Sequence, residues 1–127
     1  MKLINERLHS FLDYFTVAVL IIAAFFLPWP AVIKYATLLL AGMQLLLSLC
    51  TAYRWGVIRL VPFLMHGWLE LLLAFLIFAM SIYWRHIQSG TGFTFYLSTG
   101  IVYLIVFLLT DFSARKTRIS SADYQGN

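Results

Sequence analysis

The sequence predicts an all-α integral membrane protein, a bundle of four transmembrane helices built from two repeated hairpins. Hydrophobic residues make up 62% of the 127 positions, only 11% are charged, and the mean hydropathy is +0.88. Soluble domains carry roughly 25% charged residues, so an ordinary soluble globule is excluded. Four apolar runs are each long enough to cross a bilayer, and a polar pattern at the start of the first run returns in the third.

The four runs are predicted as helices that alternate in direction. A run of about 20 residues reaches roughly 30 Å, the thickness of the bilayer core. Pro28 and Pro30 end the first run, so the second must return beside it, and Pro62 can open the third. The second run carries small and polar residues on one face that is expected to pack against other helices: Thr37, Ala41, Gln44, Ser48 and Thr51. The runs cover residues 8–27, 31–53, 64–84 and 93–112.

The chain is expected to form a single transmembrane domain of two repeats, 8–53 and 64–112. Residues 54–63 would be an interfacial linker, predicted as a short helix in the headgroup region. The glycine-rich stretch 85–92 is predicted to be the longest flexible loop, and residues 113–127 form a polar tail.

A five-residue pattern supports the duplication. It reads HSFLD at residues 9–13 and HGWLE at 66–70, so 66 − 9 and 70 − 13 are both 57. Gly42 and Gly100 are offset by 58 and, as small residues, are expected to permit close helix contact. Each half has two spans, so both halves would insert the same way, as a parallel repeat about an axis along the membrane normal.

Lysine and arginine are biased toward the predicted ends and middle of the chain. This bias predicts an inner membrane protein of the bacterial type, multi-pass, with the linker and both termini in the cytoplasm. The other two loops contain only Lys34 and Arg85. The cytoplasmic set is Lys2, Arg7, Arg54, Arg59, Arg115, Lys116 and Arg118.

This topology gathers polar residues in the cytoplasmic half of the bundle. In each repeated pattern the histidine and the acid are four residues apart, on one helical face. Ionisable residues inside a membrane are costly and mark candidate functional sites. The predicted cluster comprises His9, Asp13, His66, Glu70, Gln44, Arg54 and Asp111.

Several chemistries could use this cluster. His9, Asp13, His66 and Glu70 could bind a metal ion as cofactor, because bundles build such sites from inward-facing side chains. Asp13 and Glu70 could relay protons or ions, as in a transporter of ions or small solutes. Haem between His9 and His66 is disfavoured by their place near the membrane edge. Alternatively, the acids pair with Arg54, Arg59 or the histidines and only fix the bundle.

No enzyme motif is present, and no catalytic residue is assigned. The chain has no phosphate-binding glycine loop, no metal-ligand cysteine pair and no HExxH motif. A single cysteine, Cys50, cannot form an internal disulfide. The net charge of +4 is explained by anionic lipid rather than by nucleic acid, because the basic residues flank apolar runs.

The tripeptide Leu27-Pro28-Trp29 lies late in the first helix of the first hairpin, and Ile82-Tyr83-Trp84 lies at the same place in the second. In this respect the chain resembles the SPW-repeat family of small bacterial membrane proteins, with Leu27 in place of the serine. The resemblance implies repeated membrane hairpins and no particular mechanism. The leading functional hypothesis rests instead on the small size of the bundle and its small residues: a structural or accessory subunit, in a homo-oligomer or with a larger membrane-protein partner.

Overall fold

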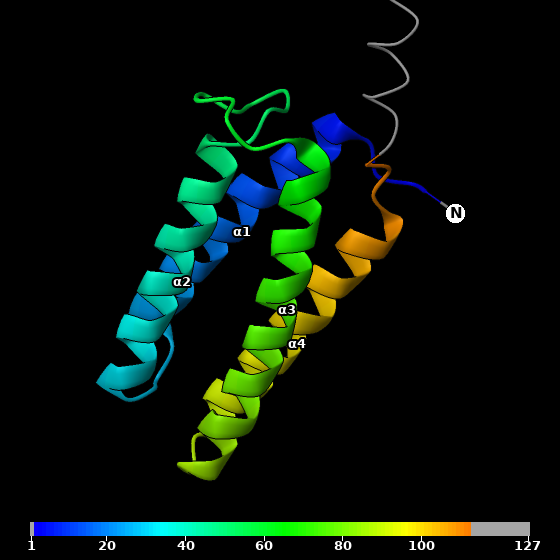
Figure 1. Ribbon diagram of the computed structural model, residues 1–127. Helices are drawn as coiled ribbons and strands as arrows, with labels where there is room; N and C mark the ends of the chain where they lie inside the picture. The colour runs from blue at the N-terminus through cyan, green and yellow to red at the C-terminus, as the bar shows by residue number, and fades with distance from the viewer. Residues whose placement is uncertain (1, 113–127) are drawn as a thin grey trace, which may run out of the picture.

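A computed structural model describes residues 2–112, which form four α-helices and no β-strand (Figure 1). The helices are α1 (Glu6–Phe26), α2 (Ala31–Leu49), α3 (Phe63–His86) and α4 (Gly90–Leu109). All four are long and apolar enough to cross a membrane. The prediction of an all-helical, four-helix chain is confirmed, whereas the predicted tail 113–127 lies outside the described residues.

Local sequence sets the helix ends. Asn5 caps α1, because its side chain accepts a hydrogen bond from the Leu8 N–H at 2.9 Å. At the other end of α1, Leu27 is extended, as expected for a residue that precedes proline. Pro30 and Pro62 directly precede α2 and α3. Both ends of α1 and the starts of α2 and α3 therefore follow from capping and proline chemistry alone.

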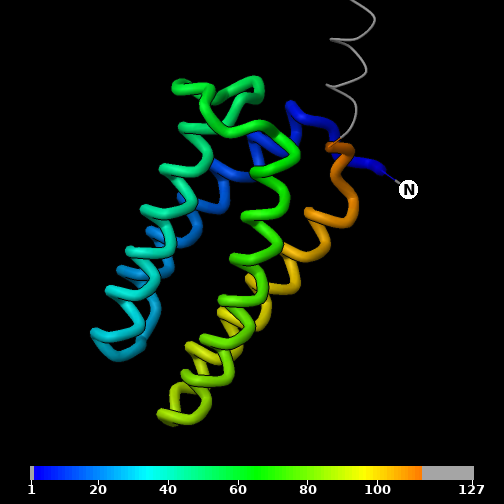
Figure 2. The backbone as a smooth tube through the Cα atoms, in the orientation of Figure 1, coloured from blue at the N-terminus to red at the C-terminus, as the bar shows by residue number. Residues whose placement is uncertain are grey.

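The helices pack as two hairpins, α1 with α2 and α3 with α4. The tube in Figure 2 shows the linker and both ends of the described chain at one end of the molecule, with the two tight turns at the other. Backbone hydrogen bonds hold the two ends of the described chain together, since Ile4 donates to Leu109 and accepts from Asp111, each at 2.9 Å. We call the end of the molecule that contains the linker the linker end, and the opposite end, with the two tight turns, the turn end.

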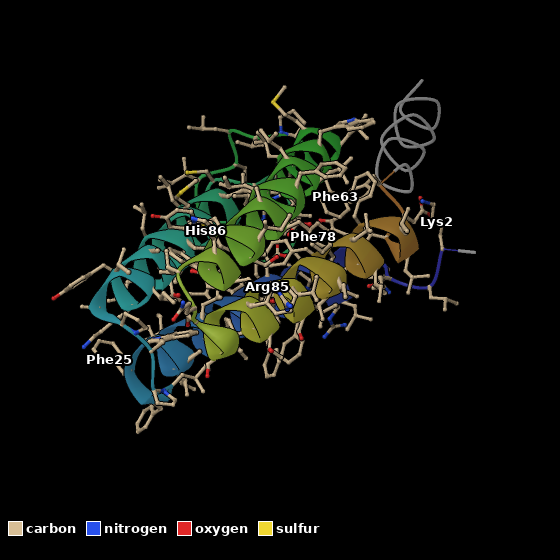
Figure 3. All side chains as sticks on the ribbon, turned by 90° about the horizontal axis from the view of Figure 1, so that it is seen from below. Lys2, Phe25, Phe63, Phe78, Arg85 and His86 are labelled. Atoms are coloured by element: carbon tan, nitrogen blue, oxygen red, sulfur yellow. The ribbon has the colours of Figure 1, made fainter. Side chains whose placement is uncertain are left out.

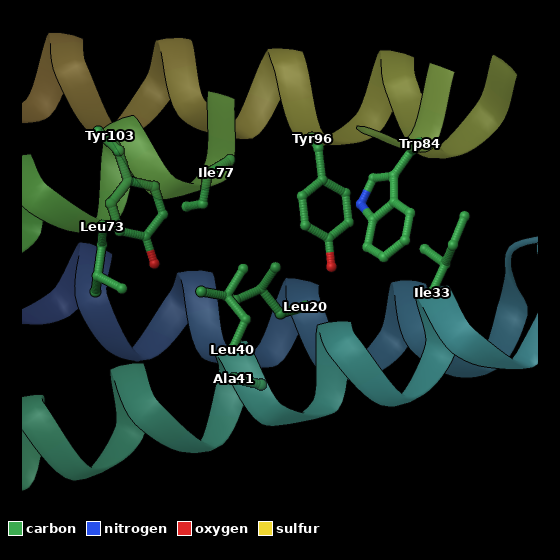
Figure 4. Packing of buried hydrophobic residues seen from close by; sticks show 10 residues of the cluster. Leu20, Ile33, Leu40, Ala41, Leu73, Ile77, Trp84, Tyr96 and Tyr103 are labelled. Carbon is green, nitrogen blue, oxygen red and sulfur yellow. The ribbon is translucent and has the colours of Figure 1, made fainter. Parts of the chain in front are cut away.

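Apolar side chains cover the outside of the helices as well as the space between the hairpins. Phe26 is 81% exposed and Leu72 is 66% exposed. In Figure 3, Phe25 lies on the outside at the turn end, far from Lys2 at the linker end. Residues buried between the hairpins form one packed cluster, part of which Figure 4 shows; it includes Leu20, Ile33, Leu40, Ile77, Trp84, Tyr96 and Tyr103.

The linker differs from its prediction. It begins at residue 50 rather than 54, because α2 ends at Leu49, and it contains no helix. The linker folds back on the end of α2: Val57 and Ile58 both donate to the Leu49 carbonyl, at 2.9 and 2.8 Å. This carbonyl is the one that a longer α2 would have used for the Tyr53 N–H, so the returning chain ends the helix early.

The connection between α3 and α4 also differs. The predicted flexible loop at 85–92 is wrong, since only residues 87–89 lie outside the helices. Ser89 explains the difference: its side chain accepts from the Gly92 N–H at 3.1 Å and caps α4 three residues before the predicted start. Gln88 makes the reversal with a left-handed φ of 64°.

The two glycines expected to permit close helix contact behave differently. A Cβ on Gly42 would meet nothing within 4 Å, so Gly42 makes no such contact, contrary to the expectation. A Cβ on Gly100 would meet the Phe78 ring at 2.9 Å, so this glycine is needed for close packing of α4 on α3. On α2, the residue 59 positions before Gly100 is Ala41, which is also small and is buried.

Gly56 is the most sterically constrained glycine in the linker, and it gives a test of the linker fold. A Cβ there would overlap the backbone carbonyl of Thr51. We expect Gly56→Ala to lower the free energy of unfolding by about 1–3 kcal/mol, measured by chemical denaturation in detergent. Gly42→Ala is the matched control and should be neutral or stabilising by up to about 1 kcal/mol. Equal stability of the two variants would contradict the linker conformation.

Candidate metal centre

Four of the predicted site residues meet at the linker end. His9 and Asp13 come from α1, and His66 and Glu70 come from α3. Both histidines are fully buried, and both carboxylates are only 3% exposed. One nitrogen or oxygen from each residue can be chosen so that all four atoms lie within 4.8 Å of one another. The i, i+4 spacing on each helix therefore brings two histidines and two acids to one point between the hairpins.

The two imidazole Nε2 atoms form the middle of the cluster, 3.3 Å apart. Each lies close to the acid of the other helix: His9 Nε2 is 3.0 Å from Glu70 Oε2, and His66 Nε2 is 3.0 Å from Asp13 Oδ2. Each lies slightly farther from the acid of its own helix, at 3.4 Å for His9 and 3.5 Å for His66. Both nitrogens thus contact both carboxylates.

Two threonines fix the orientation of the imidazoles. His66 Nδ1 lies 2.6 Å from Thr51 Oγ1, and His9 Nδ1 lies 2.8 Å from Thr110 Oγ1. Each hydroxyl also lies 2.6 Å from the backbone carbonyl four residues earlier, to which it donates its single proton. The hydroxyls must then accept from Nδ1–H. In a neutral imidazole this leaves the Nε2 lone pair directed into the cluster.

The same contacts occur twice, at residue numbers shifted by 57 for one partner and by 59 for the other. Adding 57 to His9 gives His66, and subtracting 59 from Thr110 gives Thr51, so the two His–Thr contacts correspond. The backbone follows the same rule, since the Ile4–Thr110 bridge corresponds to the bridge between Val61 and Thr51. Because each histidine contacts the threonine of the other hairpin, the cluster joins the two hairpins.

Two further side chains bind the acids from outside the cluster. The Tyr53 hydroxyl donates to Asp13 Oδ2 at 2.7 Å, and the Gln44 amide donates to Glu70 Oε1 at 3.3 Å. Tyr53 lies in the linker; its burial raises the pKa of the phenol above the ordinary value, and the Asp13 charge raises it further. The phenol therefore remains a hydrogen-bond donor, which holds one carboxylate oxygen in place.

The other predicted members lie outside the cluster. Arg54 and Arg59 are exposed, and among the described residues the close nitrogen contacts of the Asp13 and Glu70 carboxylates are with the histidines, so arginine pairing is not observed. Asp111 follows α4, and its backbone N–H donates to Ile4. It is not one of the four convergent ligands.

The geometry suits a small cation better than a haem. Tetrahedral zinc has ligands at about 2.0–2.2 Å, which corresponds to ligand–ligand distances of about 3.3–3.6 Å. The nitrogen–nitrogen and nitrogen–oxygen distances of 3.0–3.5 Å are close to these values. A porphyrin could not fit between two nitrogens 3.3 Å apart with both acids against them. Neutral imidazole nitrogens and carboxylate oxygens are ordinary ligands of zinc and its neighbours.

Sequence reasoning assigned no role at the site to Thr51, Thr110 or Tyr53; it placed Thr51 only on a face expected to pack against other helices. The two threonines carry a recognisable signal, since 110 − 51 is 59, close to the 57 of the histidines. Tyr53 carries none: its counterpart at the same offset is Phe112, which cannot donate a hydrogen bond. Phe112 instead packs its ring against His9 at a centroid distance of 5.6 Å.

Compared with models of protein families, with curated proteins and with solved structures, the chain has no match. The resemblance to the SPW-repeat family therefore stays an expectation from sequence. The chemistry of the site is therefore inferred from its distances, burial and contacts.

Tyr53 gives a test of how the cluster is held. Tyr53→Phe keeps the ring and removes the hydroxyl with its hydrogen bond to the Asp13 carboxylate, so we expect a loss of about 1.5–3 kcal/mol in unfolding free energy. Tyr14→Phe is the matched control, because the Tyr14 hydroxyl donates to the Trp55 carbonyl at an exposed position. It should change stability by less than about 1 kcal/mol. Equal losses in the two variants would show that the Tyr53–Asp13 hydrogen bond stabilises the protein no more than the exposed Tyr14–Trp55 hydrogen bond does.

Proposed function

We propose that the chain is a small multi-pass membrane protein that binds one divalent transition-metal ion of the zinc class through His9, Asp13, His66 and Glu70. The observation that carries the proposal is the threonine contact of each imidazole. With both Nδ1 atoms donating to Thr51 and Thr110, the two Nε2 lone pairs face each other at 3.3 Å. Two neutral imidazoles in this position need a cation or protons between them.

Charge balance supports the same assignment. Asp13 and Glu70 bring two negative charges into a buried site, and exposed Arg54 and Arg59 do not offset them. An unpaired buried charge costs several kcal/mol. One divalent ion with two neutral imidazoles neutralises the cluster, and each ligand then has the donor atom that the ion requires.

The ion would stabilise the protein rather than catalyse a reaction. Four protein ligands complete a tetrahedral shell, the arrangement of structural zinc sites, whereas catalytic sites keep one position open. Two ligands come from each hairpin, so the ion would hold the hairpins together at the linker end. This role agrees with a structural or accessory subunit, which would act in a homo-oligomer or beside a larger membrane protein.

The membrane placement follows from the helices and the charges. We infer that α1–α4 span a bacterial inner membrane, in contact with lipid through their exposed apolar faces, and that the hairpins arose by duplication. The corresponding His–Thr and backbone contacts support the duplication. The linker end carries Lys2, Arg7, Arg54 and Arg59, which favours the cytoplasm for this end and hence for both termini.

Metal analysis of the purified protein tests the proposal. Protein isolated in mild detergent without chelator, then dialysed against zinc, should hold one zinc ion per chain by elemental analysis. His9→Ala and His66→Ala should each lose it, whereas His86→Ala, which removes an exposed histidine at the turn end, should retain it. Wild-type protein with no bound ion after zinc loading, or zinc retained by His9→Ala with His66→Ala, would overturn the proposal.

A further inference from the structure

Polar side chains continue from the cluster toward the turn end, on the faces of α2 and α4 that meet between the hairpins. The first series, from the linker end, is Thr51 in the linker, then Gln44 and Thr37 on α2. The second is Thr110 just after α4, then Tyr103 and Tyr96 on α4. Successive members are seven residues apart, since 51 − 44, 44 − 37, 110 − 103 and 103 − 96 are all 7. Seven residues are two helical turns, about 10.5 Å, so the members form successive levels.

The level next to the cluster contains Gln44 and Tyr103. Gln44 donates its amide to Glu70, but its buried Oε1 atom has no hydrogen-bond partner among the described residues. The buried Tyr103 hydroxyl likewise has none among these residues. A buried polar atom without a partner costs about 1–3 kcal/mol, so two at one level require an explanation.

The next level contains Thr37 and Tyr96, whose hydroxyls are hydrogen-bonded to each other at 2.7 Å. Trp84 follows toward the turn end, with its ring against Tyr96 at a centroid distance of 5.6 Å. Figure 4 shows the hydroxyls of Tyr103 and Tyr96 both directed from α4 toward the opposite hairpin, with the Trp84 nitrogen beside Tyr96. The hydrogen-bonding groups thus extend along most of the bundle.

Three aliphatic side chains separate the two polar levels. Leu20, Leu40 and Ile77 are exposed by 1%, 3% and 0%, and they lie between Tyr103 and Tyr96 in Figure 4. Leu20 and Ile77 are each seven residues beyond an acid of the cluster, Asp13 and Glu70, and they are offset by 77 − 20 = 57. Both hairpins therefore contribute to this apolar layer, which we call the plug.

We propose that these levels form a proton pathway between the cluster and the turn end, closed by the plug of Leu20, Leu40 and Ile77. Water molecules beside Gln44 and Tyr103 would satisfy their unpartnered atoms and extend the hydrogen-bonded chain from Glu70. Apolar constrictions close such pathways by excluding water, and a polar or smaller side chain at the constriction lets water through. The pathway depends on the helices spanning a membrane, and it does not depend on a bound metal ion.

Proton flux into liposomes tests the pathway. The protein is reconstituted with a pH-sensitive dye inside, and a potassium diffusion potential drives protons inward. Wild-type protein should conduct slowly, whereas Leu20→Ser with Ile77→Ser should conduct at least tenfold faster. Adding Tyr103→Phe with Tyr96→Phe to this variant should remove most of the gain, because the hydroxyls carry the hydrogen-bonded chain. A general leak would not depend on these two hydroxyls.

Ile22→Ser is the matched control, since Ile22 is on the same helix but 57% exposed on the outside. Leu20→Ala, which reduces volume without adding polarity, serves as a second opening variant if the serine pair does not fold. Flux through the opened variants that equals flux through Ile22→Ser, or that survives loss of both hydroxyls, would overturn the pathway. Zinc content measured on the same samples reports separately on the metal site, so flux without bound zinc would overturn the metal site alone.

Discussion

Asp13→Asn should abolish zinc binding and destabilise the protein more than any conservative change outside the cluster. Asp13 contacts both imidazoles and accepts a hydrogen bond from Tyr53. Loss of its charge therefore removes one metal ligand and leaves these three buried groups without the carboxylate that they contact. Breaking one side of a buried charge cluster costs about 3–5 kcal/mol. Chemical denaturation in detergent should show this loss, and a zinc titration should show no site of the wild-type affinity.

A comparison with chelated protein separates the two parts of this effect. Chelation should destabilise the wild type, because an ion that binds only the folded state stabilises it by mass action. Chelation should leave Asp13→Asn unchanged, since this variant holds no ion. If chelator destabilises both proteins equally, the ion lies elsewhere and Asp13 is not a ligand.

Thr51→Val with Thr110→Val should weaken zinc binding by about 100-fold, although neither threonine is a ligand. Valine keeps the shape but cannot accept from the imidazole Nδ1–H, so His9 and His66 lose the contacts that orient their Nε2 atoms. Loss of one such outer contact typically costs 10–100-fold in metal affinity. Competition with a calibrated zinc chelator measures the affinity, and each single variant should lie between the double variant and the wild type.

Thr99→Val is the control for this experiment. The Thr99 hydroxyl also donates to the carbonyl four residues earlier, at 2.8 Å, but it contacts no histidine. Zinc affinity should therefore be unchanged in Thr99→Val. An equal loss of affinity in the control would assign the effect to helix stability and not to imidazole orientation.

Much of the fold follows from the sequence because its signals are local. Apolar runs of bilayer length predict the helices, and prolines or caps such as Asn5 set their ends. Two predicted helix ends are wrong, and both depend on contacts that no local pattern shows. The Leu49 carbonyl is taken by residues of the returning linker, and Ser89 caps α4 from a stretch whose glycines indicate a loop.

The four cluster residues could be selected from the sequence because two equal patterns place them on equivalent faces. The arrangement that gives the cluster its chemistry could not, because it depends on cross-hairpin contacts. The crossing of His9 to Thr110 and His66 to Thr51 follows from how the hairpins dock. Arg54 shows the opposite case: its position in the chain favours the cluster, but the non-helical linker leaves it exposed.

X-ray absorption at the zinc edge of the loaded protein tests the central claim most directly. The account predicts four nitrogen or oxygen neighbours at about 2.0–2.1 Å, with the outer-shell scattering of two imidazoles and no sulfur. This signal should vanish in the His9→Ala, His66→Ala variant and persist in His86→Ala. A six-oxygen shell without imidazole scattering, or a sulfur neighbour near 2.3 Å from Cys50, would contradict the assignment of the ion to this cluster.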